Sequence, residues 1–424
     1  MSAAPLMSAR RVSLIGALLV AVGPVSMALY TPAMPAVGTV FDSPEAVVKL
    51  SLTLYFGGFA CAQLIAGPLS DALGRRPVTI AFMAIYCLAS LGAFLAPSIE
   101  VLVLSRFVQG IGASVGVAIS RALVRDLFTG EESSRIMNLI GIILALGPAL
   151  APTIGGLTLA VAGWRAIFAL MVLIGFAVIA VTLLAMRETV TPDRSRLKLG
   201  ALFRSYAMLL GNGHFLTASL VMAGALGALY AQATFLPFIL MSEVGLTPTQ
   251  FGLGMLMQSG AFFVGSLVVR ALMPRIGATP LVPIGLGFIA AGSLGSATLL
   301  LWAPSFLHVM VPVSTYAFGI AFVMPAMSTA ALAPFARNAG AAAAMLGFLQ
   351  MGAGLLIGSI GALFGDTVVA MGLLIPLMGA TACIAYLLHR ARPSLPTPEP
   401  GAAPARRLGQ SALNDARTVH SPPK

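Results

Sequence analysis

The chain has 424 residues, of which 58% are hydrophobic and only 9% are charged. Soluble domains have about 25% charged residues, so this composition excludes an ordinary soluble protein and indicates a membrane protein. The net charge is +11, but the basic residues lie in short gaps between long apolar runs, which favours a role in membrane topology over nucleic-acid binding.

The apolar runs predict twelve transmembrane helices. A helix needs about 20 mostly apolar residues to cross the hydrocarbon layer, and continuous runs favour helices over the alternating strands of a barrel. Arg10 and Arg11 precede the first run as in a signal peptide, but residues 30–32 do not form a small-residue cleavage site, so we expect an uncleaved first span. The predicted spans are residues 12–34, 46–70, 77–97, 100–123, 134–160, 164–186, 213–240, 249–272, 279–301, 308–331, 338–364 and 367–390.

Arginine and lysine are distributed unequally among the gaps between these spans. With a cytoplasmic N-terminus, nearly all of them fall on the cytoplasmic side, and the opposite side holds only Lys49 and Arg165. This bias predicts a multi-pass protein of a bacterial inner membrane, surrounded by lipid, with both termini in the cytoplasm.

The longest internal gap divides the chain into six spans plus six. Gly67 and Gly265 occupy similar places in spans two and eight, which resembles an internal repeat of the kind found in transporters. We predict an N-terminal six-helix half over residues 1–190, a basic cytoplasmic central loop over 191–212 with an amphipathic patch near 197–210, a C-terminal six-helix half over 213–391, and a disordered cytoplasmic tail over 392–424.

The gap after span two reads Gly67-Pro68-Leu69-Ser70-Asp71-Ala72-Leu73-Gly74-Arg75-Arg76. A basic turn explains Arg75, Arg76 and Gly74, but topology gives no reason for an acid at Asp71. The segment resembles the loop signature G-x-x-x-D-x-x-G-R-R of the major facilitator superfamily. The resemblance implies that fold, an all-α membrane protein of two six-helix halves.

The same resemblance implies a conformational switch built on this loop. Asp71 would dock against the start of span eleven, between Arg337 and Gly340, and a motif arginine would pair with Asp126. A helix N-terminus favours a negative charge, so this latch could be made in one state and broken in the other.

Span four contains Arg106-Phe107-Val108-Gln109-Gly110-Ile111-Gly112. An arginine about 9 Å into a span costs about 3 kcal/mol on insertion scales, so it either extends to the outer interface or faces a polar cavity. The segment resembles the family motif R-x-x-Q-G-x-G, which favours the cavity. Because spans one, four and seven line the cavity in this fold, the candidate substrate or coupling residues are Tyr30, Arg106, Gln109 and Gln232.

Span five contains the pairs Gly147-Pro148 and Gly155-Gly156. Such residues permit bending and close helix packing. The pattern also resembles the antiporter signature of drug exporters, which sugar symporters of the superfamily usually lack.

Longer segments narrow the resemblance to the Bcr/CflA branch (bicyclomycin and chloramphenicol resistance) of the twelve-span drug:proton antiporters. The likeness extends from about Arg11 to His389 and implies a monomer that exports small drug-like or metabolite molecules in exchange for protons. The segments are residues 30–35, 121–128, 163–168 and 339–348.

One position departs from that branch. The branch has an acid two residues before the tyrosine near the end of span one, and this chain has Ala28 there. The middle third of every predicted span lacks Asp and Glu. An embedded cation would then have no counter-charge, so we expect neutral or anionic substrates, and the residue that carries a coupling proton stays open.

Two other interpretations stay open. The chain could be an importer, a symporter or a uniporter of a small neutral or anionic metabolite, against which the span-five signature argues. A membrane sensor or enzyme would need features that the sequence does not offer, because no nucleophile–base pair or metal-ligand spacing occurs. We therefore expect no enzymatic activity, no cofactor, no metal and no nucleic-acid partner.

Overall fold

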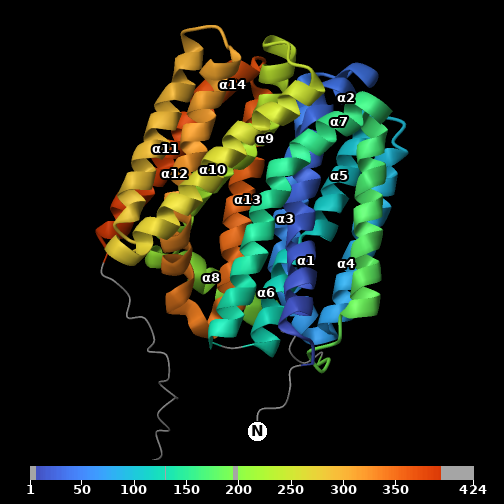
Figure 1. The fold of residues 1–424 in the computed structure, drawn as a ribbon, viewed down its shortest axis with the longest axis vertical. Helices are drawn as coiled ribbons and strands as arrows, with labels where there is room; N and C mark the ends of the chain where they lie inside the picture. The colour runs from blue at the N-terminus through green and yellow to red at the C-terminus, as the bar shows by residue number, and fades with distance from the viewer. Residues whose placement is uncertain (1–5, 129, 194–198, 393–424) are drawn as a thin grey trace, which may run out of the picture.

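The computed structural model describes residues 6–128, 130–193 and 199–392; the side chains of some positions inside helices, among them Pro148 and Arg337, are outside this description. Within these ranges every regular element is a helix, and the long helices stand side by side in one bundle (Figure 1). α1 begins at the bottom of Figure 1, and α14 runs from the top of the bundle down to its lower left side, so both ends of the described chain lie toward one end of the bundle, which we call the terminal side. The other end is called the opposite side. The predicted tail lies outside the description from residue 393 onward.

Eleven helical stretches among the described residues are long and apolar enough to cross a membrane. One of them belongs to α7, whose 56 residues would extend about 84 Å as a single straight helix, far beyond the roughly 30 Å of a hydrocarbon layer. Gly163 interrupts α7 with φ 78° and ψ 174°, and the chain turns back there. α7 therefore supplies two crossings, which is consistent with the twelve predicted spans.

The first half contains two crossings that are made of more than one element. The first crossing continues from α1 through a 3₁₀ turn into α2, and the fourth breaks at Ser114, after the glycines of the Arg106 segment. The elements are α1 (Ala9–Tyr30), η1 (Thr31–Ala33), α2 (Met34–Val40), α3 (Glu45–Leu73), α4 (Arg75–Phe94), α5 (Ile99–Ala113), α6 (Val115–Leu127) and α7 (Gly130–Ala185).

In the second half, side-chain caps fix where four helices begin, and Ser305 caps the one that starts at Phe306. Asn212 accepts hydrogen bonds from the backbone of His214 and Phe215, Thr247 forms a capping box with Gln250, and the Asp366 carboxylate caps the last helix. The elements are α8 (Leu199–Gly211), α9 (Gly213–Pro237), η3 (Phe238–Glu243, π-helical), α10 (Pro248–Ile276), α11 (Leu281–Ala297), η4 (Thr298–Leu300), α12 (Phe306–Leu332), η5 (Ala333–Asn338), α13 (Ala339–Leu363) and α14 (Thr367–Arg390).

Buried apolar side chains form two large clusters, one for each half. Apart from Ala233 and Phe238, the first cluster lies within residues 7–186, and the second lies within residues 206–386. The halves meet mainly through two helix pairs, α3 with α13 and α7 with α10. The bundle therefore consists of two six-crossing bodies in contact along two seams.

The segment expected to be a central loop holds a helix. α8 covers most of the predicted amphipathic patch, and its apolar residue Leu209 is fully buried against the bundle. The Tyr206 hydroxyl donates a hydrogen bond to the backbone oxygen of Leu64, at 2.5 Å, and burial raises the pKa of Tyr206 to about 12, so this donor keeps its proton. α8 is thus tied to α3 of the first half.

Candidate functional site

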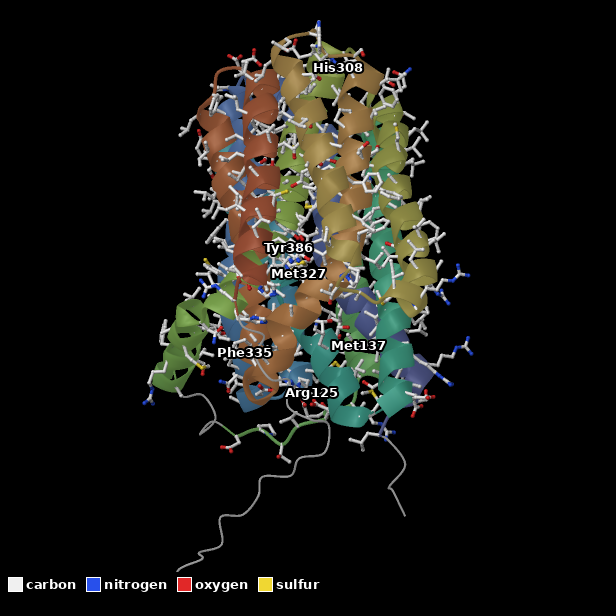
Figure 2. The ribbon with its side chains drawn as sticks, turned by 90° about the vertical axis from the view of Figure 1, so that its left-hand side faces the viewer. Arg125, Met137, His308, Met327, Phe335 and Tyr386 are labelled. Carbon is white, nitrogen blue, oxygen red and sulfur yellow. The ribbon has the colours of Figure 1, made fainter. Side chains whose placement is uncertain are left out.

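A cavity of about 1050 Å³ lies between the two halves at the terminal side. Its lining includes Gln63 and Asp71, which are two helical turns apart on α3, about 12 Å along the axis. Figure 2 labels Arg125 and Met137, two further lining residues, near this end of the bundle. α3 and α6 of the first half face α8 and the start of α13 in the second half, so the halves are apart here.

Arg75 is the centre of the charged groups at the mouth of this cavity. Its side chain is buried, with Nη2 2.5 Å from Asp71 Oδ1 and Nε 3.1 Å from Asp126 Oδ2. Nη1 also donates to the hydroxyl of Ser70, at 2.6 Å. The geometry gives the guanidinium an acid from α3 and another from α6, so it connects the ends of two neighbouring crossings.

Asp71 and the start of α13 both line the cavity, and no hydrogen bond or ion pair joins them among the described residues. Residues 338–341 line the cavity together with Asp71, and a side-chain atom added at Gly340 would meet open space. Among the described side chains, Asp71 pairs with Arg75. The predicted docking of Asp71 at this helix N-terminus stays a prediction, and the side chain of Arg337, also predicted there, lies outside the description.

Glu188 is a member of this cluster that the sequence interpretation missed. Its carboxylate accepts hydrogen bonds from the backbone N–H groups of Arg75 and Arg76, at 2.9 and 3.0 Å. It thereby caps α4 directly after the turn at Gly74, which has φ 101°, a conformation that favours glycine. The sequence offered the same signal for Glu188 as for Asp71, because each is an acidic residue beside basic residues at the end of a predicted span.

Arg106 lies inside the first half with no exposed surface. Its Cζ atom lies 4.6 Å from the centre of the Tyr30 ring and 4.3 Å from that of Tyr55. Nη1 donates to the side-chain oxygen of Gln109, whose amide nitrogen donates to Ser90 at 2.6 Å. The side chain does not extend to the outer interface; the structure brings Tyr30, Arg106 and Gln109 together in one buried polar cluster.

Gln232 lies in the second half, apart from this cluster. It is fully buried on α9, and its side-chain oxygen accepts a hydrogen bond from Gln258 of α10 at 2.9 Å. Neither Arg106 nor Gln232 lines the cavity at the terminal side. Their contact with a substrate therefore stays a prediction.

The span-five glycines lie where α7 packs against other helices. A side-chain atom added at Gly155 would meet the backbone oxygen of Leu29, and one at Gly156 would meet that of Pro248 in the other half. Thr153 adds a hydrogen bond to the backbone oxygen of Gly252, at 2.9 Å. These contacts hold α7 and α10 together at the opposite side. Gly147 packs on Val25, and the Pro148 side chain lies outside the described positions.

A second contact between the halves at the opposite side is polar. Lys49 Nζ lies 3.1 Å from Glu45 Oε2 and donates to Thr367 Oγ1 at 2.5 Å, while the Thr367 hydroxyl donates to Glu45 at 2.8 Å. Lys49 also lies 5.1 Å from the centre of the Phe238 ring. Although the sequence marked Lys49 only as a topology residue, its side chain is 2% exposed.

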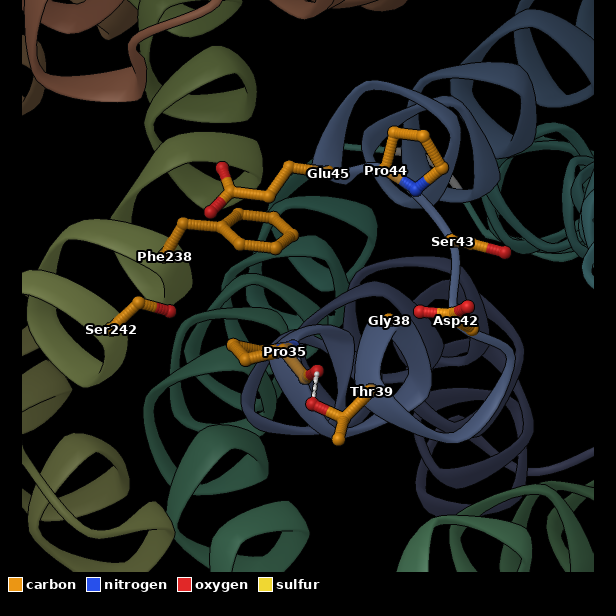
Figure 3. Close-up of a pocket in the computed structure, with 9 residues that line it drawn as sticks. All are labelled: Pro35, Gly38, Thr39, Asp42, Ser43, Pro44, Glu45, Phe238 and Ser242. Carbon is orange, nitrogen blue, oxygen red and sulfur yellow. Dashed lines mark hydrogen bonds between the residues drawn. The ribbon is translucent and has the colours of Figure 1, made fainter.

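Glu45 borders a small cavity that belongs to the opposite side. This cavity has a volume of about 490 Å³. In Figure 3 the Glu45 carboxylate lies beside the Phe238 ring, with Ser242 on the same side of the pocket and Asp42 on the other side. The two halves are thus separated by a cavity at the terminal side. At the opposite side they are joined by the Lys49–Thr367 and Thr153–Gly252 hydrogen bonds. No group of three or more His, Cys, Asp or Glu side chains that could hold a metal occurs in the ranges described.

Comparisons with known proteins agree on one family. The sequence model of the Major Facilitator Superfamily matches residues 16–362. The chain is 30% identical to the Multidrug resistance protein D of Escherichia coli (strain K12), covering 87% of this chain and 93% of that protein. It is 31% identical to a Chloramphenicol resistance protein of Pseudomonas aeruginosa, covering 80% and 79%.

Solved structures agree on the fold. A crystal structure of a bacterial homologue of the human lysosomal transporter Spinster superposes with a TM-score of 0.68 at 16% identity, over 90% of this chain and 96% of that one.

Proposed function

Since this chain belongs to the major facilitator superfamily, we propose that it exports small drug-like or metabolite molecules across a bacterial inner membrane in exchange for protons. The terminal side then faces the cytoplasm, and the opposite side faces the periplasm. The large cavity is the entrance for substrate in the inward-open state.

The position of Gly155 and Gly156 carries the proposal. These glycines remove the side chains that would separate α7 from α1 and from α10, so a segment that resembles the antiporter signature lies in the seal between the halves. The names of the relatives, a multidrug resistance protein and a chloramphenicol resistance protein, favour export over import.

Alternating access would proceed by rocking of the two halves around a central site. In the inward-open state the α7–α10 and Lys49–Glu45–Thr367 contacts are closed. In the outward-open state these contacts would separate, and Asp71 would reach the free start of α13. A ligand shifts such an equilibrium only through contacts that differ between the states, and the charged groups at both ends supply such contacts.

The substrate class follows from the charges of the interior. The buried cation Arg106 lies in the first half, whereas the acids of the described ranges lie in loops or in the end turns of crossing segments. A desolvated cationic drug would meet a like charge without a counter-charge. We therefore assign neutral and anionic molecules to this pathway.

A drug-susceptibility panel in cells that lack their main pumps tests the proposal. Expression should raise the minimal inhibitory concentration of a neutral drug such as chloramphenicol and lower its accumulation, and loss of the proton gradient should remove both effects. Cells that express Asp71→Asn at the same level provide the control. Increased accumulation on expression would instead identify an importer, and no change for any compound of the panel would contradict drug export.

A further inference from the structure

We propose that Arg106 is an anion-binding residue, and that its Nε and Nη2 atoms hold the carboxylate of an aromatic acid that this protein carries. The inference rests on the proposed function, because it names a substrate class for that pathway. The observation behind it is that the buried guanidinium of Arg106 has two hydrogen-bond donors on one edge that no described side chain accepts from.

Arg106 is a buried charge without an ionic partner. None of the ion pairs among the described residues includes it, and its side chain has no exposed surface. Burying a charge is unfavourable unless the charge is paired and hydrogen-bonded. The rings of Tyr30 and Tyr55 and the oxygen of Gln109 stabilise the cation, but none of them carries a negative charge.

The hydrogen bonds of the cluster leave one edge of the guanidinium unused. Nη1 donates to Gln109, whereas Nε and Nη2 are buried and have no hydrogen-bond partner among the described side chains. Nε and Nη2 form the edge that matches the two oxygens of a carboxylate in a bidentate contact. An acceptor with two oxygens and a negative charge would satisfy both donors and the charge together.

The neighbouring side chains do not supply that acceptor. The Tyr30 hydroxyl shares a hydrogen bond with Ser51 at 2.7 Å, and the Tyr55 hydroxyl donates to the backbone oxygen of Gly23 at 2.8 Å. Gln109 accepts from Nη1 with its side-chain oxygen, which carries no negative charge, and its nitrogen donates to Ser90. In the described ranges, the acidic residues lie in loops or in the end turns of crossing segments, so they offer no carboxylate to this edge, and a bound anion would supply one.

The surroundings favour a ligand with an aromatic body. The Tyr30 ring packs against Phe168 with centres 5.5 Å apart, and Tyr55 packs against Phe59 at 6.4 Å. Aromatic rings pack well in such a surface. Long aliphatic acids would leave these ring contacts unused, so benzoate-like acids fit the chemistry best.

Arg106 is covered by other side chains in the inward-open conformation, and some of these side chains contact the second half. Phe56, next to Tyr55 on α3, meets the Tyr230 ring of α9 with centres 5.4 Å apart. Because Tyr55 covers Arg106 and Phe56 is held by the second half, separation of the halves at this level would release the cover. Access to Arg106 is therefore expected to depend on the transport cycle.

Equilibrium binding to the purified full-length protein in lipid nanodiscs tests this inference, with radiolabelled benzoate and its uncharged counterpart benzamide as probes. The wild type should bind benzoate at least about tenfold more tightly than benzamide. Arg106→Gln should lose that preference, and Arg106→Lys should lose most of it because an ammonium cannot form the two-point contact. Arg270→Gln, which removes a charge from the exposed end of α10, should bind benzoate as the wild type does.

Equal binding of benzoate and benzamide by the wild type would overturn the inference without any variant, even if the Arg106 variants do not fold. Unchanged benzoate affinity in a monodisperse Arg106→Gln protein would also overturn it. Either result combined with intact chloramphenicol export would leave the proposed function in place. Loss of chloramphenicol export by the wild type would count against the proposed function itself.

Discussion

Lys49 on α3 donates a hydrogen bond to Thr367 on α14, with 2.5 Å between Nζ and Oγ1. One residue of each half thus takes part in a buried contact at the closed end of the pathway. Because Lys49 is 2% exposed and its acidic partner Glu45 is 47% exposed, the cation is enclosed and the acid remains accessible from the opposite side. This contact makes the charge of Glu45 important for the closed state.

Glu45→Gln should shift the protein toward the outward-open state. The substitution leaves a buried ammonium without its counter-charge, and opening relieves that cost. We expect a shift of about tenfold in the equilibrium, or about 1.4 kcal/mol, less than for a fully buried pair because Glu45 is half-exposed. The measurement is the labelling rate of a cysteine at Ser205, which lines the terminal cavity, in a protein whose native cysteines are replaced by serine; this rate should fall.

Glu131→Gln is the matched control for this experiment. It breaks the exposed pair with Arg135, in which both side chains are more than 80% exposed, so labelling at position 205 should stay at the wild-type rate. Equal labelling of the Glu45→Gln and Glu131→Gln proteins would show that the Lys49 contact does not hold the closed state.

Asp71→Asn should abolish transport while the protein still inserts and purifies normally. Asparagine cannot neutralise Arg75 in the present state, and it carries no charge to place at the start of α13 in the other state. We expect transport to fall at least about tenfold, measured as drug accumulation at matched expression. Glu132→Gln, at an exposed acid of α7, serves as the control. Near wild-type transport by Asp71→Asn would refute the latch.

Gly156→Leu should prevent closure of the seal between α7 and α10. A side chain at this position would collide with the backbone oxygen of Pro248, and backbone cannot yield as a flexible side chain can. The expected results are slower labelling of the cysteine at position 205 and loss of export. Gly287→Leu is the control, because a side-chain atom there meets open space. Full activity of Gly156→Leu would exclude a close contact at the seal.

Ala28→Asp should extend the range of exported substrates to cationic molecules. Ala28 is 4% exposed on α1, two residues before Tyr30, and a carboxylate there would lower the cost of holding a cationic drug near Arg106. Ethidium efflux from energised cells should be weak in the wild type and stronger in the variant. Strong, gradient-dependent ethidium efflux by the wild type would mean that an acid outside the interior serves the pathway, and it would contradict the assignment of neutral and anionic substrates.

The fold could be predicted from the sequence because long apolar runs have few stable solutions in a membrane. Predicted and observed limits agree to within a few residues for α3 and α13. At Gly163 the helix α7 reverses without an intervening loop, and the sequence had already placed a boundary between two spans at this point. The all-α fold in two halves and the family are confirmed.

The contacts within the candidate site were less predictable, for physical reasons. Lys49 and Thr367 are far apart in the chain, and no local pattern indicates that a lysine at the edge of a span will be covered by another helix. Glu188 accepts hydrogen bonds from backbone N–H groups. Because almost every residue has such a group, the sequence does not indicate which ones Glu188 will contact. Arg106 and Gln109 were recognised through the resemblance to the motif R-x-x-Q-G-x-G, and their side chains meet because they lie three residues apart on one helix. Gln232 instead accepts a hydrogen bond from Gln258 within the second half, a pairing that no local pattern indicates.

Counterflow of protons and substrate in proteoliposomes tests the central claim most directly. The purified protein is reconstituted with a fluorescent pH indicator in the lumen, an inward-acidic gradient is imposed, and uptake of labelled chloramphenicol is followed together with lumenal pH. The vesicle lumen then corresponds to the periplasm, so we expect chloramphenicol uptake coupled to proton exit. Asp71→Asn and collapse of the gradient should each abolish this uptake. Chloramphenicol movement in the same direction as the protons, or chloramphenicol uptake that is equal with and without the gradient, would contradict export by proton exchange.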